Sequence, residues 1–267
     1  MKIGIVQGAF APITKSDWNE IINWKKVNHF RKVIIVPIGD SEISVFDRIK
    51  MIKQLTDNYR HLSVAYNYQV DDTCVILNIE SKPWDFMMAK LFPVTRKYLL
   101  DHELFIEEIA KQYVSDKRWV HVKSMTKLAI ELATIYNVDL HITRLAGLFH
   151  DCTKNWNQET TYSCMRFSHP DFLDRPFAIL HQYTAVTYLK RVLRVTDKEV
   201  LRAVGNHVLG DDTSLLGKII YIADKLDPSR GYDSKKDIEI CKSNLDYGFR
   251  IVKQQQEEYV AREGIEK

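Results

Sequence analysis

The sequence predicts two domains, an α/β domain with a parallel sheet followed by an all-α domain. The 267 residues suffice for about two domains of ~150 residues each. The first hundred residues alternate short apolar runs with helical patterns, which is typical of parallel strands joined by helices. Beyond them, apolar residues recur only at helical spacing. We place the domains at residues 1–104 and 105–267.

The elements of the first domain follow from its apolar runs. Residues 2–6 read as a buried strand that ends in a glycine turn, and residues 17–29 as a helix. Residues 32–38 form a second apolar run, residues 46–55 show helical periodicity, and residues 61–66 are a candidate third strand. Strand, helix, strand and helix in succession indicate a parallel sheet.

The second domain is predicted to contain helices only. Apolar residues recur three and four positions apart within residues 125–136, 180–189 and 200–204, and residues 215–223 are strongly apolar. The sequence shows no internal repeat.

Composition and charge exclude several classes of protein. The net charge is only +3, which lacks the clustered positive charge that nucleic acids require. The longest apolar run near the N-terminus, residues 33–38, is too short to span a membrane. The four cysteines include no Cys-x-x-Cys pair, so neither a thiolate zinc site nor a disulfide scaffold is indicated. We expect a cytoplasmic protein with no nucleic-acid or membrane partner.

Four histidines and two aspartates lie in or at the ends of apolar helical segments of the second domain. They are His121, His150, Asp151, His181, His207 and Asp224. Imidazole together with carboxylate suits iron, manganese or zinc, and burying so many ionisable groups without a metal would be costly. A single packed histidine is common and an isolated His-Asp pair carries little information, so the prediction of a metal site depends on the whole set.

The pair His150 and Asp151 also predicts where its helix ends. Consecutive helical side chains point about 100° apart, so both can reach one metal only where the chain leaves the helix. The stretch Asp151–Asn155 fits such an opening.

The order His…His-Asp…His…His…Asp resembles the HD-domain metal-dependent phosphohydrolases. It is most similar to the YqeK-type branch, which hydrolyses diadenosine tetraphosphate symmetrically to two ADP. The matching stretches are residues 118–121, 144–154, 179–181, 206–207 and 218–230. The ending Ala223-Asp224-Lys-Leu-Asp227-Pro-Ser-Arg230 marks this branch. The resemblance covers roughly residues 105–260.

The resemblance implies two divalent metal ions, with iron associated with the branch and manganese or another ion as the alternative. It implies that His121, His150, Asp151 and Asp224 hold one ion. Asp151 then bridges to a second ion held by His181 and His207. Two such cations lower the pKa of a shared water, so that hydroxide can attack phosphorus near neutral pH.

The resemblance also implies which residues contact the nucleotide substrate. The expected catalytic residues are Asp151, Lys154 and Arg230. The expected substrate-binding residues are Lys154, Arg230, Arg118 and Asp227. The branch typically shows His-Thr-Thr-Gly after its fourth histidine, whereas this chain has His207-Val-Leu-Gly-Asp-Asp212. The difference bears on substrate preference.

The first domain resembles the nicotinate-nucleotide adenylyltransferases, which implies a Rossmann-like sheet of the nucleotidylyltransferase type. Gly8-Ala-Phe-Ala-Pro-Ile-Thr-Lys-Ser-Asp17 corresponds to that family's Gly-x-Phe-Asp-Pro-x-His-x-Gly-His. Thr14 and Asp17 replace both phosphate-binding histidines, so we expect no adenylyl transfer. The domain then serves as a nucleotide-shaped cleft, a surface for forming a homodimer, or only a folding scaffold.

Two other functions stay open. One is an HD phosphohydrolase acting on another nucleotide, since pocket shape rather than metal ligands decides the substrate. The other is a nucleotide-binding regulator without turnover. Product analysis separates the first from diadenosine tetraphosphate hydrolysis, and nucleotide binding without bound metal would favour the second.

Overall fold

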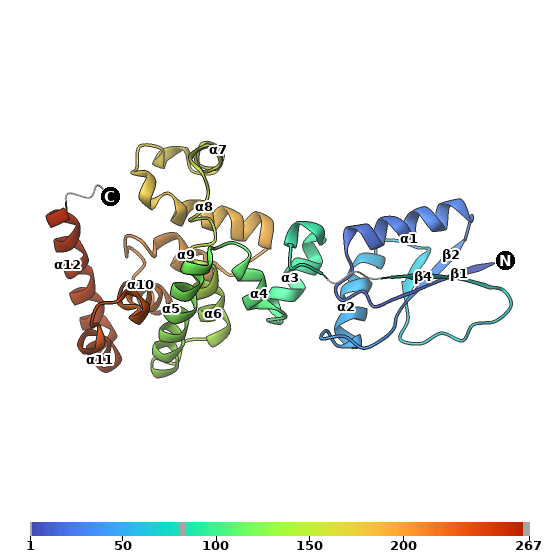
Figure 1. Ribbon diagram of the computed structural model, residues 1–267, viewed down its shortest axis with the longest axis horizontal. Coiled ribbons are helices and arrows are strands. Elements are labelled where there is room, and N and C mark those ends of the chain that lie inside the picture. The colour runs from blue at the N-terminus through green and yellow to red at the C-terminus, as the bar shows by residue number, and fades with distance from the viewer. Residues whose placement is uncertain (1, 81–83, 264–267) are drawn as a thin grey trace. The chain divides into compact units, whose positions relative to one another are not determined.

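A computed structural model of the chain describes residues 2–80 and 84–263 (Figure 1). The chain divides into two compact units, Met1–Phe105 and Ile106–Lys267. The boundary expected from the sequence lies one residue earlier. Each unit is described by itself.

The first unit contains a parallel sheet, as predicted. Its strands are β1 (Ile3–Gly8), β2 (Lys32–Pro37), β3 (Leu62–Val64) and β4 (Cys74–Ile79). Their order is β3-β2-β1-β4, and each neighbouring pair is parallel. The sequence analysis did not identify β4. This strand lies at the sheet edge, and five of its six residues are half-buried or exposed, whereas Ile79 is buried.

Helices α1 (Lys15–Val27) and α2 (Val45–Thr56) pack against the same face of this sheet (Figure 1). Side chains alternate across a strand, so Val6 and Ile35 point to that face while Ile5 and Ile34 point to the other. Partly buried residues of the segment between β3 and β4, including Tyr68, pack against the second face. Helix α3 (Pro93–Asp101) contacts α2.

Thr14 and Asp17, which stand at the histidine positions of the adenylyltransferases, cap helix α1. The Thr14 Oγ1 accepts a hydrogen bond from the Asp17 backbone N–H at 3.2 Å, and the Asp17 Oδ2 accepts one from the Thr14 N–H at 2.8 Å. This reciprocal pair is a capping box. Both side chains are therefore engaged in holding the helix end.

Arg48 of α2 joins the carboxyl ends of β1 and β2. Its guanidinium donates to the carbonyl oxygens of Ala9 at 2.8 Å, Ile38 at 3.0 Å and Gly39 at 2.9 Å. Ligands of open α/β sheets bind outside these carboxyl ends, where the strand order reverses. In this unit the buried Arg48 side chain links the loops at that edge of the sheet.

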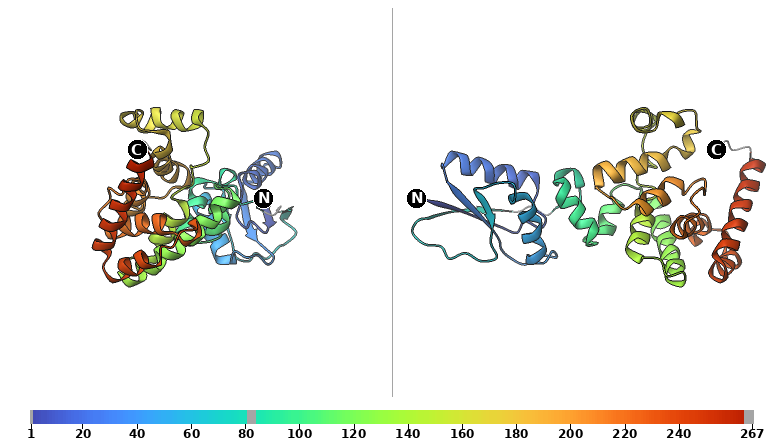
Figure 2. Two further views of the ribbon diagram at one scale, coloured as in Figure 1. Left: turned by 60° about the vertical axis from the view of Figure 1, so that its left-hand side comes forward. Right: turned by 180° about the vertical axis from the view of Figure 1, so that it is seen from behind.

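Within residues 106–263 the regular elements of the second unit are all helices, and the all-α prediction is confirmed. Its helices are α4 (Ile106–Lys111), α5 (Asp116–Ile135), α6 (Leu140–Phe149), α7 (Gln158–Ser168), α8 (His181–Tyr188), α9 (Lys198–Asn206), α10 (Leu215–Leu226), α11 (Lys235–Ser243) and α12 (Leu245–Glu263). Figure 2 shows them from two further directions. Among the described residues, no helix combines the length and apolar character that crossing a membrane would need.

Helices α5, α6, α9 and α10 pack on one another and form the core of this unit. Gly147 lets α6 approach α5 closely, because a Cβ at this position would lie 2.7 Å from the Thr126 Oγ1. Buried leucine and isoleucine side chains such as Leu132 and Ile219 fill the space between the helices. This packing brings the C-terminal ends of α6 and α9 together with α10.

Candidate metal centre

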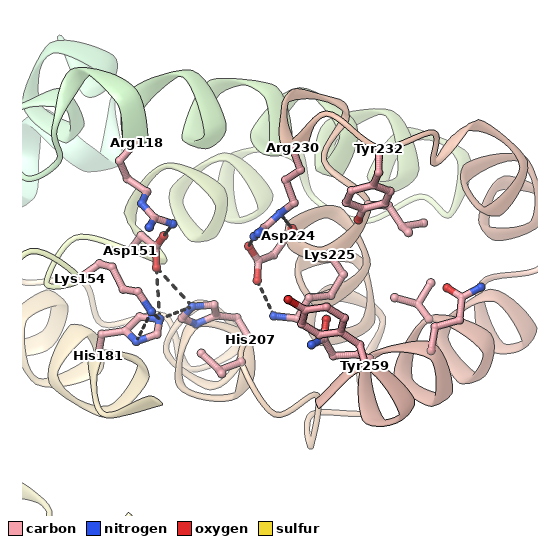
Figure 3. Close-up of a pocket in the computed structure, with 15 residues that line it drawn as sticks. Arg118, Asp151, Lys154, His181, His207, Asp224, Lys225, Arg230, Tyr232 and Tyr259 are labelled. Carbon is pink, nitrogen blue, oxygen red and sulfur yellow. Dashed lines mark hydrogen bonds and ion pairs between the residues drawn. The ribbon is translucent and has the colours of Figure 1, made fainter. Parts of the chain in front are cut away.

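The six candidate metal ligands come from five helices or their ends and lie together beside one cavity (Figure 3). All six side chains belong to buried residues. His121 lies within α5, His181 begins α8, and His150 and His207 are the residues that end α6 and α9.

Asp151 stands at the centre of the cluster. Helix α6 ends at Phe149, so the chain leaves the helix where the sequence placed the opening. The Asp151 Oδ1 lies 3.3 Å from the His181 Nε2 and 3.6 Å from the His207 Nε2. The Oδ2 lies 3.4 Å from the His150 Nε2. One carboxylate therefore faces three imidazoles.

Hydrogen bonds on the far side of each ring determine which nitrogen faces the cluster. The Nδ1 atoms of His150 and His207 lie 2.7 Å from the backbone carbonyl oxygens of Gly147 and Val204. A carbonyl oxygen only accepts, so both Nδ1 atoms carry the proton and both Nε2 atoms present a lone pair. The Nδ1 of His181 lies 3.0 Å from a third carbonyl oxygen.

The cluster contains buried lone pairs that lack donors. Within the described part of the chain, the Nε2 atoms of His121 and His150 have no hydrogen-bond partner. The Nε2 atoms of His181 and His207 lie 3.2 Å apart. Unpaired buried acceptors beside carboxylates are unfavourable unless a cation lies between them. The residues therefore fit a metal site.

The pKa shifts of His181, His207 and Asp151 agree with ligands that are ready to bind. Burial lowers the pKa of His181 to about 4, against the opposing effect of Asp151, so its imidazole is neutral near pH 7. Burial also lowers the pKa of His207. Burial alone would raise the pKa of Asp151, but the surrounding histidines hold it well below its ordinary value.

Two groups of three residues can each hold an ion. They are His121, His150 and Asp151, and Asp151, His181 and His207. Within each group the ligand atoms lie within 4.8 Å of one another, and Asp151 belongs to both. Nitrogen and oxygen donors of this kind suit iron, manganese and zinc. Asp224 lies beside the first group, with its Oδ1 3.2 Å from the His121 Nε2.

Cationic side chains surround the two carboxylates (Figure 3). The Arg118 Nη1 lies 3.0 Å from the Asp151 Oδ2, and the Arg230 Nη2 lies 2.7 Å from the Asp224 Oδ1. The Lys225 Nζ lies 2.7 Å from the Asp224 Oδ2. Lys225 was not singled out from the sequence, because a lysine next to an aspartate carries no signal of its own.

Lys154 lies beside the second group. Its Nζ is 3.1 Å from the Ala178 carbonyl oxygen and 3.1 Å from the His181 Nδ1. Burial lowers its pKa, and the charge of Asp151 partly offsets that effect. Lys154, Arg118 and Arg230 all line the cavity.

Asp227, the fourth residue expected to contact the substrate, lies against His121 and is not among the residues that line the cavity. Its side chain is fully buried, and its Oδ2 accepts a hydrogen bond from the His121 Nδ1 at 2.8 Å. The carboxylate lies behind His121 and orients that imidazole, as carboxylates commonly do behind metal-binding histidines.

The cavity has a volume of about 720 Å³. Its wall away from the histidines includes Tyr232 and three side chains of α12 that the sequence analysis did not single out, namely Gln255, Gln256 and Tyr259. The three α12 residues, together with Val252 of the same helix, follow the i, i+3, i+4, i+7 spacing of one helix face. That spacing was a readable signal, although by itself it indicates only packing.

The fold and the cluster define the class of this second unit as a helical hydrolase domain with a metal-binding His/Asp set. The family model of the HD domain matches residues 118–229. Among solved structures, a predicted HD superfamily hydrolase involved in NAD metabolism from Clostridium acetobutylicum aligns with a TM-score of 0.55 and 27% identity. The alignment covers 60% of this chain and 87% of the other.

The symmetrical bis(5'-nucleosyl)-tetraphosphatase of Halalkalibacterium halodurans is 30% identical over 128 residues, which are 47% of this chain and 68% of that protein. The probable nicotinate-nucleotide adenylyltransferase/Ap4A hydrolase of Mycoplasma genitalium is 26% identical over 253 residues, covering 84% and 72% of the two chains. This chain belongs to the HD-domain hydrolase family that includes these tetraphosphatases.

Proposed function

We propose that this chain hydrolyses diadenosine tetraphosphate symmetrically to two ADP, with two divalent metal ions, preferably iron. The observation that carries the proposal is the pair of ligand groups that share Asp151 beside a cavity lined with cations. The names of the relatives support the choice of substrate. All four cysteines are unpaired, which supports a reducing cytoplasm as the place of action.

The six ligand residues fall into two sets, one for each ion, which share Asp151. His121, His150, Asp151 and Asp224 would hold one ion, and Asp151, His181 and His207 the other. When bound, such ions supply a water of lowered pKa and offset negative charge on phosphoryl oxygens.

Arg118, Lys154, Lys225 and Arg230 line the cavity and bind phosphate oxygens in this proposal. Three of them pair with Asp151 or Asp224 in the structure. Because bound metal would neutralise these carboxylates, the cations become free to contact a polyphosphate chain. Their fixed positions then orient the substrate over the ligand cluster.

We propose that the first unit transfers no adenylyl group. The capping box uses Thr14 and Asp17, and Arg48 ties the loops at the edge where a nucleotide would bind. A scaffold role fits these contacts. Incubation with nicotinate mononucleotide and ATP should release no pyrophosphate, and pyrophosphate formation would contradict this part of the proposal.

The test of the hydrolase is product analysis after incubating iron- or manganese-loaded protein with diadenosine tetraphosphate. ADP as the sole product is expected, whereas ATP with AMP would overturn symmetrical cleavage. Asp151→Ala should abolish turnover and reduce the metal content. Asp246→Ala is the matched control, because Asp246 is an exposed aspartate that pairs with Lys218 on the surface.

A second candidate is hydrolysis of another nucleotide by the same ligands. The observation that favours it is Val208, which lines the cavity directly after His207 where the resembling branch carries a hydroxyl. Metal-loaded protein that leaves diadenosine tetraphosphate intact but releases phosphate from a different nucleotide would favour this alternative.

A further inference from the structure

The cavity has a cationic half and an aromatic half (Figure 3). The cationic half contains Arg118, Lys154, Lys225 and Arg230 beside the ligand cluster. The aromatic half is bordered by Tyr232, which follows the short turn Pro228–Arg230, and by helix α12. A nucleotide has the same division, with a charged phosphate chain at one end and an apolar, planar base at the other.

Two tyrosines of the aromatic half keep much of their ring surface exposed. Tyr232 is 49% exposed and Tyr259 is 46% exposed, yet both border the cavity. Most large aromatic side chains bury their rings, and tyrosine that stays open beside a polar cavity is suited to bind a planar apolar group. Bases stack on such rings whatever their identity.

Gln256 adds a hydrogen-bonding group on the same wall. It is half-buried beside the cavity, and its amide has no hydrogen-bond partner among residues 2–80 and 84–263. An amide offers one donor and one acceptor side by side, which complements the N6 and N7 atoms of adenine. Guanine presents two acceptors at the equivalent edge, so the amide oxygen would face one of them.

Contacts in its N-terminal half and middle attach helix α12 to the rest of the second unit. The Lys253 Nζ donates to the Gly210 carbonyl oxygen at 3.0 Å and lies 3.2 Å from the Asp211 Oδ1. Phe249 packs edge-on against Tyr221 of α10 at a centroid distance of 5.4 Å. Asp211 belongs to the segment after His207 where this chain departs from its relatives' usual sequence. That departure supplies an anchor for the wall that carries Gln256 and Tyr259.

We propose that Tyr232, Gln256 and Tyr259 form a base-binding subsite that favours adenine over guanine. The choice of nucleotide rests on the proposed function, whereas the subsite itself requires only a ligand with a base and phosphates. Phosphates bind to the cationic half, and the base stacks against the tyrosines of the aromatic half. These three residues are thus specificity-determining rather than catalytic.

The experiment compares binding of ADP, GDP and inorganic pyrophosphate to the full-length, metal-loaded protein by calorimetry. Stacking contributes ~1–3 kcal/mol per base and tenfold equals ~1.4 kcal/mol, so Tyr259→Ala should weaken ADP binding about 5- to 140-fold. Pyrophosphate binding should not change, because it has no base. Tyr259→Phe should keep most of the ADP affinity.

Tyr247→Ala is the matched control for Tyr259→Ala. Tyr247 lies on the same helix, is 50% exposed, and has Arg250 over its ring at 5.8 Å, as Tyr259 has Arg262 at 5.6 Å. It does not line the cavity. Its replacement should leave ADP binding unchanged.

Gln256→Arg tests the choice of base. Arginine pairs with the O6 and N7 atoms of guanine, so this variant should shift the ADP-to-GDP affinity ratio toward GDP by at least about fivefold. Gln254→Arg is the control, since Gln254 binds Glu258 and lies off the cavity wall.

The outcomes separate the subsite from the proposed function. Wild-type ADP affinity in Tyr259→Ala, or an equal loss of ADP and pyrophosphate binding, would overturn the subsite even if diadenosine tetraphosphate is hydrolysed. ADP binding that depends on Tyr259 in a protein that does not cleave diadenosine tetraphosphate would support the subsite while the proposed function fails.

Discussion

Replacing Asp227 with asparagine tests whether a buried carboxylate behind His121 controls metal affinity. Asparagine keeps the volume, and its one amide oxygen can still accept from the His121 Nδ1–H. The change removes the negative charge and replaces the other oxygen, which accepts from the Ser229 N–H at 3.0 Å, with an NH2 group. Burial opposes ionisation of Asp227, but the hydrogen bond from His121 helps to lower its pKa to about 2, so the group is charged near pH 7.

The expected magnitude follows from this one bond. Hydrogen bonds to a charged group contribute ~1.5–3 kcal/mol, against ~0.5–1.5 kcal/mol for neutral ones. Replacing the charged bond with a neutral one therefore loses ~1 to ~1.5 kcal/mol, which makes metal affinity about 5- to 12-fold weaker, at the low end of the ~10- to 100-fold effect usual for such partners. Turnover should fall in parallel at limiting metal and recover as metal is added.

The assay is titration of the metal-free protein with Mn²⁺ or Fe²⁺, followed by calorimetry. Asp197→Asn is the control, because Asp197 caps α9 through the N–H groups of Glu199 and Val200 and lies away from the histidines. Wild-type metal affinity in Asp227→Asn would refute the positioning role, provided that the melting temperature is unchanged.

Three further changes have defined outcomes. His181→Ala should lower the metal content from two ions per chain toward one, measured by elemental analysis, while an unchanged content would argue against the second ligand group. Arg48→Met should cost roughly 2–4 kcal/mol in urea unfolding, because three carbonyl groups lose their charged donor, whereas the exposed Arg60→Met should change little. Burial and the bond to Asp47 raise the pKa of Tyr98 to about 12, above its unfolded value of ~10. The melting-temperature difference between wild type and Tyr98→Phe should therefore be constant below pH 10 and shrink toward pH 12.

Much of the fold could be predicted because apolar periodicity is a local property. The alternation of runs in residues 2–66 indicated parallel strands and helices, and the helical spacing beyond residue 105 indicated the second unit. Strand β4 was not predicted because an edge strand buries only part of its side chains, so its apolar pattern is weak. Its pairing with β1 depends on a contact between segments far apart in the chain.

The candidate ligands could be named from the sequence because imidazole and carboxylate groups suit such metals, and these six lie in or at the ends of apolar helical segments. The residues that hydrogen-bond to those ligands could not be predicted from the sequence. Asp227 and His121 are 106 positions apart, and only the packing of the turn after α10 against α5 shows that the carboxylate points at the imidazole. Likewise, the spacing of the α12 residues that line the cavity predicts only ordinary packing. Their place in the cavity wall became visible from the residues that lie across the cavity.

The capping box at the start of α1 bears on the trade-off between activity and stability. An N-terminal cap stabilises a helix by ~0.5–2 kcal/mol, and two histidines placed there for phosphate binding would forgo that stabilisation. Thr14 and Asp17 supply it. Under the proposed scaffold role, the first unit is free to evolve as a more stable support, and placing histidines at positions 14 and 17 would lower its stability.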